Sequence, residues 1–116
     1  MPTFTAPYLK HLARQLFVGL GTPDDLAEIV STSLVGANLA GHDSHGIIQV
    51  PIYAAAVQSG QIKPAVRPSV APPTGMLATL AVDGALGWGP PAAYLASDRI
   101  SERAQWQWSR IFWVRM

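Results

Sequence analysis

The sequence has 116 residues, which suits one small domain, and 49% of them are hydrophobic, which is enough apolar material for a core. Eight lysines and arginines nearly balance seven aspartates and glutamates, and no basic run suggests binding to nucleic acid or to an anionic membrane. The absence of cysteine removes disulfides, thiolate nucleophiles and cysteine-ligated zinc from consideration, and it favours a cytoplasmic location. We expect neither a signal peptide nor a membrane span, because polar residues, proline or glycine interrupt every apolar stretch.

A first helix is predicted to follow Thr5, whose hydroxyl can cap it. Gly19 and Gly21 are typical of a helix end. Between these signals, apolar residues recur at three- and four-residue spacing: Leu9, Leu12, Leu16, Phe17 and Leu20. The spacing predicts one apolar helix face.

A second helix is predicted to start directly afterwards, with Thr22 as N-cap, Pro23 at the first helical position and Asp24 and Asp25 where the helix dipole favours negative charge. Its apolar stripe ends at Gly41 and comprises Leu26, Ile29, Val30, Leu34, Ala37 and Leu39. The first 41 residues are therefore predicted to form a helical hairpin.

A third helical pattern runs from His45 to Gly60, and Pro51 must either kink this helix or start it afresh. The prolines from Pro64 to Pro73 exclude a helix and indicate an extended segment. Residues 77–82 are predicted to form a strand, Asp83-Gly84 indicates a turn, and Pro90-Pro91 opens a further helix. The fold class that follows is α/β, more closely α+β.

The last twelve residues differ from the rest of the chain. Three of the four tryptophans lie between Trp106 and Trp113, alternating with polar residues, which is typical of an aromatic strand. We therefore divide the chain into a main region, residues 1–104, and an aberrant Trp-rich tail, residues 105–116, for which a frameshift is our hypothesis.

Most of the groups that can carry chemistry lie in Gly41-His42-Asp43-Ser44-His45-Gly46. One interpretation is catalytic: if Ser44 caps the following helix, His45 lies in its first turn, where the dipole favours neutral imidazole, and His45 could exchange a proton with a substrate oxygen. Ser44 is a weaker candidate nucleophile, because its flanks differ from the Gly-x-Ser-x-Gly elbow of hydrolases.

Two other interpretations of this cluster remain open from the residues alone. A metal could be held by His42, Asp43 and His45, with a further ligand from His11 or a distant carboxylate, although this set is short of a usual zinc site. The cluster could also be a polar corner between helices, in which Asp43 or Ser44 caps a helix.

Several motifs follow one another in fixed order: the run 37–46 (Ala-Asn-Leu-Ala-Gly-His-Asp-Ser-His-Gly), Pro51-x-Tyr53, Gly60, Pro64, Pro68, Val82-Asp83-Gly84 and Gly87-x-Gly89. This set resembles the malate/L-lactate dehydrogenase family, which includes ureidoglycolate dehydrogenase, diketogulonate reductase and the cyclic imino-acid reductases. The joint order and spacing of these motifs is far more specific than any one motif. The resemblance covers nearly everything before Gln105.

The resemblance implies a non-Rossmann fold that moves a hydride between NAD or NADP and a small 2-hydroxy or 2-oxo acid, or a related imine. By position, His45 would be the catalytic acid/base, with Ser44 beside the substrate and nicotinamide, and no metal would be needed. Many relatives have an arginine four residues after the histidine; here Gln49 is the candidate substrate-binding residue, and Ile52 replaces another often basic position. The full-length family is expected to be homodimeric.

Family members are roughly three times this length, so we expect most coenzyme-contacting residues to lie beyond residue 116. The resemblance therefore implies an N-terminal fragment of such a dehydrogenase, one that is inactive alone. The alternative function is a non-enzymatic helical module that dimerises through its apolar faces.

Overall fold

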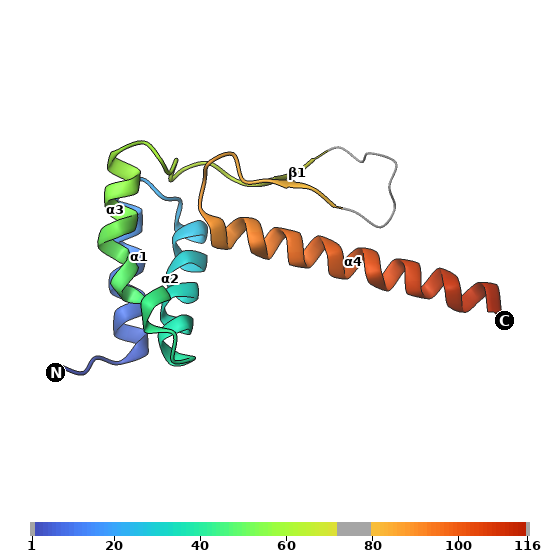
Figure 1. Ribbon diagram of the computed structural model, residues 1–116, viewed down its shortest axis with the longest axis horizontal. Coiled ribbons are helices and arrows are strands. Elements are labelled where there is room, and N and C mark those ends of the chain that lie inside the picture. Colours follow the sequence, from blue (N-terminus) through green and yellow to red (C-terminus); the bar gives the residue numbers. More distant parts are fainter. Residues whose placement is uncertain (1, 72–79, 116) are drawn as a thin grey trace.

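The computed structural model describes residues 2–71 and 80–115, with side chains described as far as Gln105. Three helices form a bundle at one end of the molecule, and a short hairpin and a long fourth helix extend from it (Figure 1). In chain order the elements are α1 (Ala6–Gly19), α2 (Asp24–Leu39), the 3-10 turns η1 (Asp43–His45) and η2 (Ile47–Gln49), α3 (Val50–Gln58), β1 (Ser69–Val70), β2 (Val82–Asp83) and α4 (Gly89–Arg115). The α+β class is confirmed.

The first two helices form the predicted hairpin. Thr5 caps α1 as expected, because its hydroxyl accepts a hydrogen bond from the Tyr8 N–H at 3.4 Å. The prediction for α2 is wrong by one residue: Pro23 is the N-cap, and the Thr22 side chain makes no capping bond. The reason is tertiary, since the Thr22 hydroxyl is buried and accepts a hydrogen bond from the Trp88 indole N–H at 3.0 Å.

Glycines end the first three helices in the same way. Gly21, Gly41 and Gly60 have φ values of 95°, 82° and 80°, in the left-handed region that glycine adopts without a steric penalty. The N–H of the residue after each glycine bonds back to a carbonyl in the last turn of its helix, which is the Schellman arrangement. The three bonds are Thr22 to Phe17 at 3.0 Å, His42 to Ala37 at 2.8 Å and Gln61 to Ala56 at 2.9 Å. The predicted helix ends are confirmed.

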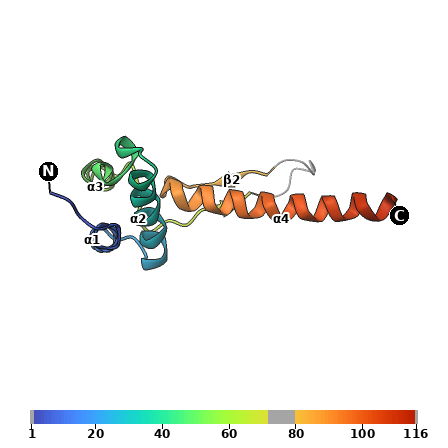
Figure 2. The ribbon, with the colours of Figure 1, turned by 90° about the horizontal axis from the view of Figure 1, so that it is seen from below.

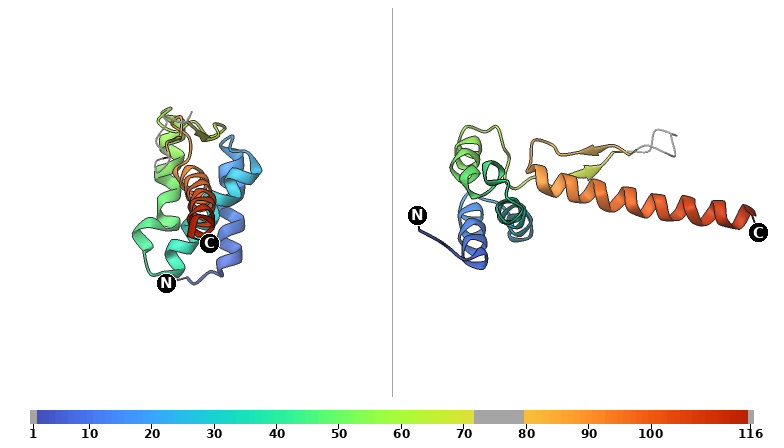
Figure 3. Two further views of the ribbon diagram at one scale, coloured as in Figure 1. Left: turned by 90° about the vertical axis from the view of Figure 1, so that its right-hand side faces the viewer. Right: turned by 60° about the horizontal axis from the view of Figure 1, so that its bottom comes forward.

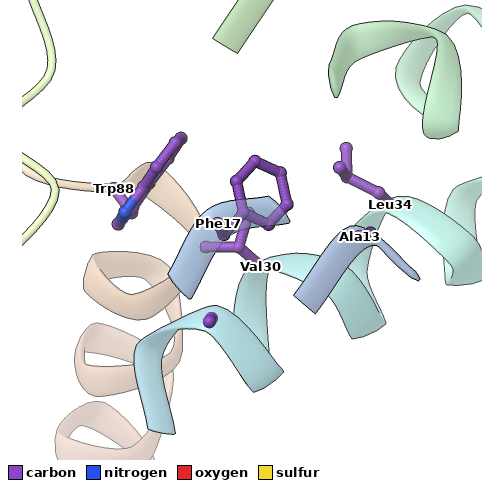
Figure 4. Close-up of a cluster of buried hydrophobic side chains, with 6 residues drawn as sticks. Ala13, Phe17, Val30, Leu34 and Trp88 are labelled. Carbon is purple, nitrogen blue, oxygen red and sulfur yellow. The ribbon is translucent and has the colours of Figure 1, made fainter. Parts of the chain in front are cut away.

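The core lies between α1, α2 and the start of α4. Figure 4 shows Phe17 from α1 lying between Trp88 and Leu34 of α2, with Val30 of α2 next to it. Phe17 meets Trp88 edge-on with ring centroids 5.1 Å apart, and the ring centroid of Tyr53 in α3 lies 5.6 Å from that of Trp88. The buried cluster comprises Ala13, Phe17, Ala27, Val30, Leu34 and Trp88. One tryptophan, from far along the sequence, thus joins all the helices.

The segment after α3 is extended as expected, and it includes β1, which pairs antiparallel with β2, Ser69 opposite Asp83. Residues 77–79 of the predicted strand lie outside the described residues, and from Leu80 to Val82 only Val82 is in a strand. The turn near Asp83-Gly84 lies slightly further along the chain: the Gly87 N–H bonds to the Gly84 carbonyl at 2.7 Å. Its central residues, 85 and 86, have φ values of 47° and 62°, as in a type I′ turn.

The strand interpretation of the tail is wrong, because α4 continues to Arg115. No glycine or proline follows Pro91, so nothing in the sequence ends the helix, and the polar residues between the tryptophans include good helix formers. Helix α4 extends away from the bundle in Figures 1 and 2 and in the right-hand view of Figure 3, whereas the left-hand view of Figure 3 looks along it. None of the described helices combines the length and apolar character that a membrane span requires.

The molecule is elongated, 60 × 30 × 22 Å, with a radius of gyration of 17.7 Å. A compact domain of this length has a radius of gyration of about 13 Å. Apolar side chains are correspondingly exposed, including a stripe on α1 formed by Tyr8, Leu12 and Leu16. These faces are available for packing against further polypeptide.

Candidate active site

The cluster from Gly41 to Gly46 forms the connection between α2 and α3. The expectation that Ser44 caps a helix with His45 in its first turn is wrong: His45 ends the 3-10 turn η1, and α3 begins only at Val50. Gly46, with φ −93° and ψ −149°, interrupts the helical path between them. The helix-dipole argument for neutral imidazole therefore does not apply, and Pro51 instead lies in the first turn of a helix that starts afresh.

Ser44 and His45 contact each other and face solvent. The Ser44 Oγ lies 2.9 Å from His45 Nδ1, and both residues are exposed. The hydroxyl can accept from Nδ1–H both in the protonated ring and in the neutral tautomer that carries its hydrogen on Nδ1. The contact therefore suits both protonation states, and Nε2 is the atom left to exchange a proton with a ligand.

Asn38, in the last turn of α2, holds both sides of this pair. Its Oδ1 accepts from the Ile47 N–H at 2.8 Å, and its Nδ2 donates to Asp43 Oδ1 at 2.7 Å. A Cβ on Gly46 would overlap the Asn38 amide. In the sequence Asn38 stands within the family motif with no role assigned to it; an asparagine three residues before a helix-ending glycine was the available signal.

Gln49, the predicted substrate-binding residue, is also tied to the loop. Its Nε2 donates to the Ser44 carbonyl at 2.7 Å, and the side chain is half-buried. One amide hydrogen is thus used to fix the backbone beside His45. Its amide oxygen and second N–H are the groups with which it can contact a ligand.

The metal interpretation lacks a ligand set. Within residues 2–71 and 80–115, no three His, Asp or Glu side chains come together in a way that could hold a metal ion. Asp43 is engaged with Asn38, and His11, the suggested further ligand, is an exposed residue of α1.

Three cations pair with acidic residues near the start of α2. No lysine or arginine occurs between residues 15 and 62, so the site loop carries no fixed positive charge. Lys10 and Arg14 pair with acidic residues of the first α2 turns, and Arg67 donates to both carboxylate oxygens of Asp25, at 2.6 and 2.9 Å. The Arg67 guanidinium lowers the pKa of Asp25 below its ordinary value.

An apolar hollow lies near the site end of α2, between that end and the first turn of α1. It measures about 380 Å³, and Leu39, 74% exposed, is at its edge. The lining residues are Ala6, Pro7, Lys10, Thr32, Val35, Gly36 and Leu39.

The chain is similar to several known dehydrogenases and reductases. Hydroxycarboxylate dehydrogenase B of Escherichia coli O157:H7 is 33% identical over 101 residues, 87% of this chain and 27% of that protein. The crystal structure of delta1-piperideine-2-carboxylate reductase from Pseudomonas syringae pvar. tomato superposes with a TM-score of 0.80 at 28% identity, covering 90% of this chain and 31% of that one. Sulfolactate dehydrogenase from Methanocaldococcus jannaschii gives a TM-score of 0.81 at 29% identity, covering 87% of this chain and 29% of that one.

The chain thus spans less than a third of the length of these relatives. The family model for malate/L-lactate dehydrogenase matches residues 4–112. The chain therefore belongs to the malate/L-lactate dehydrogenase family.

Proposed function

We propose that this chain supplies the proton-transfer part of an NAD- or NADP-dependent oxidoreductase that acts on a small 2-hydroxy or 2-oxo acid, or on a related imine. The observation that carries the proposal is the exposed Ser44–His45 pair, joined at 2.9 Å on a tethered loop in a member of this family. We propose that the 116 residues alone are inactive, since the loop that holds Ser44 and His45 has no lysine or arginine that could bind the phosphates of a coenzyme.

In this proposal His45 is the acid/base. When a 2-oxo acid is reduced, the protonated His45 gives its Nε2 proton to the carbonyl oxygen, which becomes the hydroxyl; in oxidation Nε2 takes the hydroxyl proton. Ser44 keeps its hydrogen bond to Nδ1 through both states and holds the ring orientation. The bound nicotinamide coenzyme supplies or accepts the hydride.

The loop that holds Ser44 and His45 fits the reacting end of such a coenzyme and not its phosphates. Ser44 and His45 would lie beside the nicotinamide ring, where a proton donor is needed. Pyrophosphate binding draws on basic side chains or helix N-termini, and residues 15–62 contain no lysine or arginine. The remaining contacts, including those that choose between NAD and NADP, belong to other parts of a longer polypeptide in this proposal.

The substrate class follows from the relatives. The names of the three proteins above refer to a hydroxycarboxylate, a piperideine-2-carboxylate and a sulfolactate, which share a small acid. In this chain Gln49 can contribute a hydrogen bond and no ion pair to such a carboxylate. We propose a small-molecule substrate, a cytoplasmic location and a homodimeric holoenzyme, with no nucleic-acid or membrane partner.

A chimeric enzyme tests the assignment of His45. The aligned 101 residues of the E. coli hydroxycarboxylate dehydrogenase B are replaced with the matching residues of this chain, and oxidation of NADH and NADPH is followed with small 2-oxo acids. Loss of a general acid slows turnover by about 10²- to 10⁴-fold, so His45→Gln should do so while coenzyme binding persists. His42→Gln, the same change three residues earlier, should leave turnover within about threefold of the parent chimera, far short of the loss of a general acid.

An active His45→Gln chimera would contradict the proposal.

A second function, the helical dimerisation module, is favoured by the exposed α1 stripe of Tyr8, Leu12 and Leu16. Sedimentation of the 116-residue chain tests it: concentration-dependent dimers that Leu12→Lys abolishes, combined with an inactive parent chimera, would support the module over the enzyme.

A further inference from the structure

We propose that Asn38 is the positioning residue of the site: its side-chain amide fixes the Ser44–His45 peptide relative to α2. The inference rests on the proposed function only for its catalytic consequence. The geometry that carries it belongs to the loop itself.

The Asn38 amide contacts the chain on both sides of the pair. Its donor reaches Asp43, the residue before Ser44, and its acceptor takes the N–H of Ile47, two residues after His45. One rigid planar group therefore sets the separation between these two points. Aspartate lacks the donor and leucine lacks both groups, so asparagine is the side chain of this size that meets both demands.

Gly46 completes the arrangement. Its φ of −93° is not in the left-handed region that favours glycine. The steric reason for a glycine here is that a Cβ at this position would overlap the Asn38 amide. Asn38 and Gly46 thus form one contact, in which the absence of a side chain on one residue makes room for the side chain of the other.

A third tether acts on the pair from the other direction. Gln49 donates to the Ser44 carbonyl, so the Ser44–His45 segment is bound at Asp43, at the Ser44 carbonyl and at Ile47. The two side chains nevertheless stay exposed. A fixed backbone beneath accessible functional groups is the arrangement that a preorganised site requires.

An exchange of the two side chains tests the proposal in the full 116-residue chain. Asn38→Asp keeps the acceptor for Ile47 but removes the donor and places two carboxylates together. Adding Asp43→Asn restores a donor and an acceptor with their positions exchanged. Asp43→Asn alone keeps an acceptor for Asn38 and is the matched control.

Two measurements report on these variants. Exchange protection of the Ile47 amide should fall about 2- to 12-fold in Asn38→Ala, the equivalent of one ordinary hydrogen bond. The ¹⁵N signals of the His45 ring report whether Nδ1 keeps its partner. They should move in Asn38→Asp and Asn38→Ala, and return to the wild-type pattern in the exchanged double variant.

Unchanged His45 ring signals in Asn38→Asp, or a double variant no closer to wild type than Asn38→Asp, would overturn the positioning role. If Asn38→Ala fails to fold, which far-ultraviolet circular dichroism shows, the isosteric exchange still decides. An active His45→Gln chimera alongside the expected ring signals would contradict the proposed function and leave the tether intact.

Discussion

The hydrogen bond from the Trp88 indole N–H to the Thr22 hydroxyl gives the sharpest test of what stabilises the helical bundle. Both residues are buried, 2% and 3% exposed, and they lie 66 positions apart in the sequence. Thr22→Val keeps the shape of the side chain and removes the acceptor, which leaves the Trp88 N–H unpaired. A buried unpaired donor costs about 1–3 kcal/mol.

The pairing can be separated from the packing by a double-mutant cycle. Trp88→Phe removes the N–H but also removes indole volume that packs against Phe17 and Tyr53, so its cost includes a cavity. When both partners are changed, neither is left unpaired. The double variant should therefore be about 1 kcal/mol more stable than the sum of the single changes predicts.

Urea unfolding followed by far-ultraviolet circular dichroism measures these differences. With an m-value of about 1.5 kcal/mol/M, a loss of 2 kcal/mol lowers the midpoint by about 1.3 M. Thr32→Val makes the same change at an exposed position of α2 and should leave the midpoint nearly unaltered. A Thr22→Val midpoint equal to that of wild type, or strict additivity in the cycle, would refute the reasoning.

Three further outcomes follow from the described contacts. Gly46→Ala should lower the free energy of unfolding by about 1–3 kcal/mol, because the added Cβ displaces the Asn38 amide. Gly36→Ala has open space around its added Cβ and should raise the free energy of unfolding by about 0.5–1 kcal/mol. Equal effects of the two changes in urea unfolding would contradict this. Because Arg67 lowers the pKa of Asp25, their pair stabilises the fold above the unfolded-state pKa of about 3.9 and ceases to do so as the pH falls through the folded-state value. Urea midpoints of Arg67→Gln and wild type should thus differ at about pH 6 and converge toward about pH 2, and a pH-independent difference would speak against the pair. Replacing residues 85–86 with Asn-Gly should stabilise the type I′ turn by about 1 kcal/mol, which thermal unfolding would show, and a lower melting temperature would count against the turn assignment.

The helices of the bundle were predictable because their signals are local. Glycine at a helix end and threonine at a helix start act through hydrogen bonds within a few residues, so Gly21, Gly41, Gly60 and Thr5 have the expected roles. The position of Ser44 and His45 on one loop was predictable in the same way, since the two residues are adjacent.

The features that the sequence did not predict depend on contacts across the fold. Threonine is a residue type favoured at helix N-caps, but burial of Thr22 against Trp88 gives its hydroxyl a different hydrogen-bond partner. The Asn38 tether could be predicted only if the end of α2 and the return of η2 to that end were already known. The alternating pattern of the tail was misleading because a short window of aromatic and polar residues fits both a strand and a helix.

Helix α2 runs from the core contact between Thr22 and Trp88 to the loop that holds Ser44 and His45. Its first residue, Asp24, follows Thr22 by two positions, and Asn38, in its last turn, lies fourteen residues or about 21 Å of helix further along. Effects of changes this far apart with no shared partners should add within about 0.5 kcal/mol. The structure therefore predicts that Thr22→Val lowers stability without moving the His45 ring signals, and that Asn38→Asp moves those signals while the two stability losses simply add. Strong coupling between the two variants would mean that α2 transmits strain from the core to the Ser44–His45 pair, contrary to local tethering by Asn38.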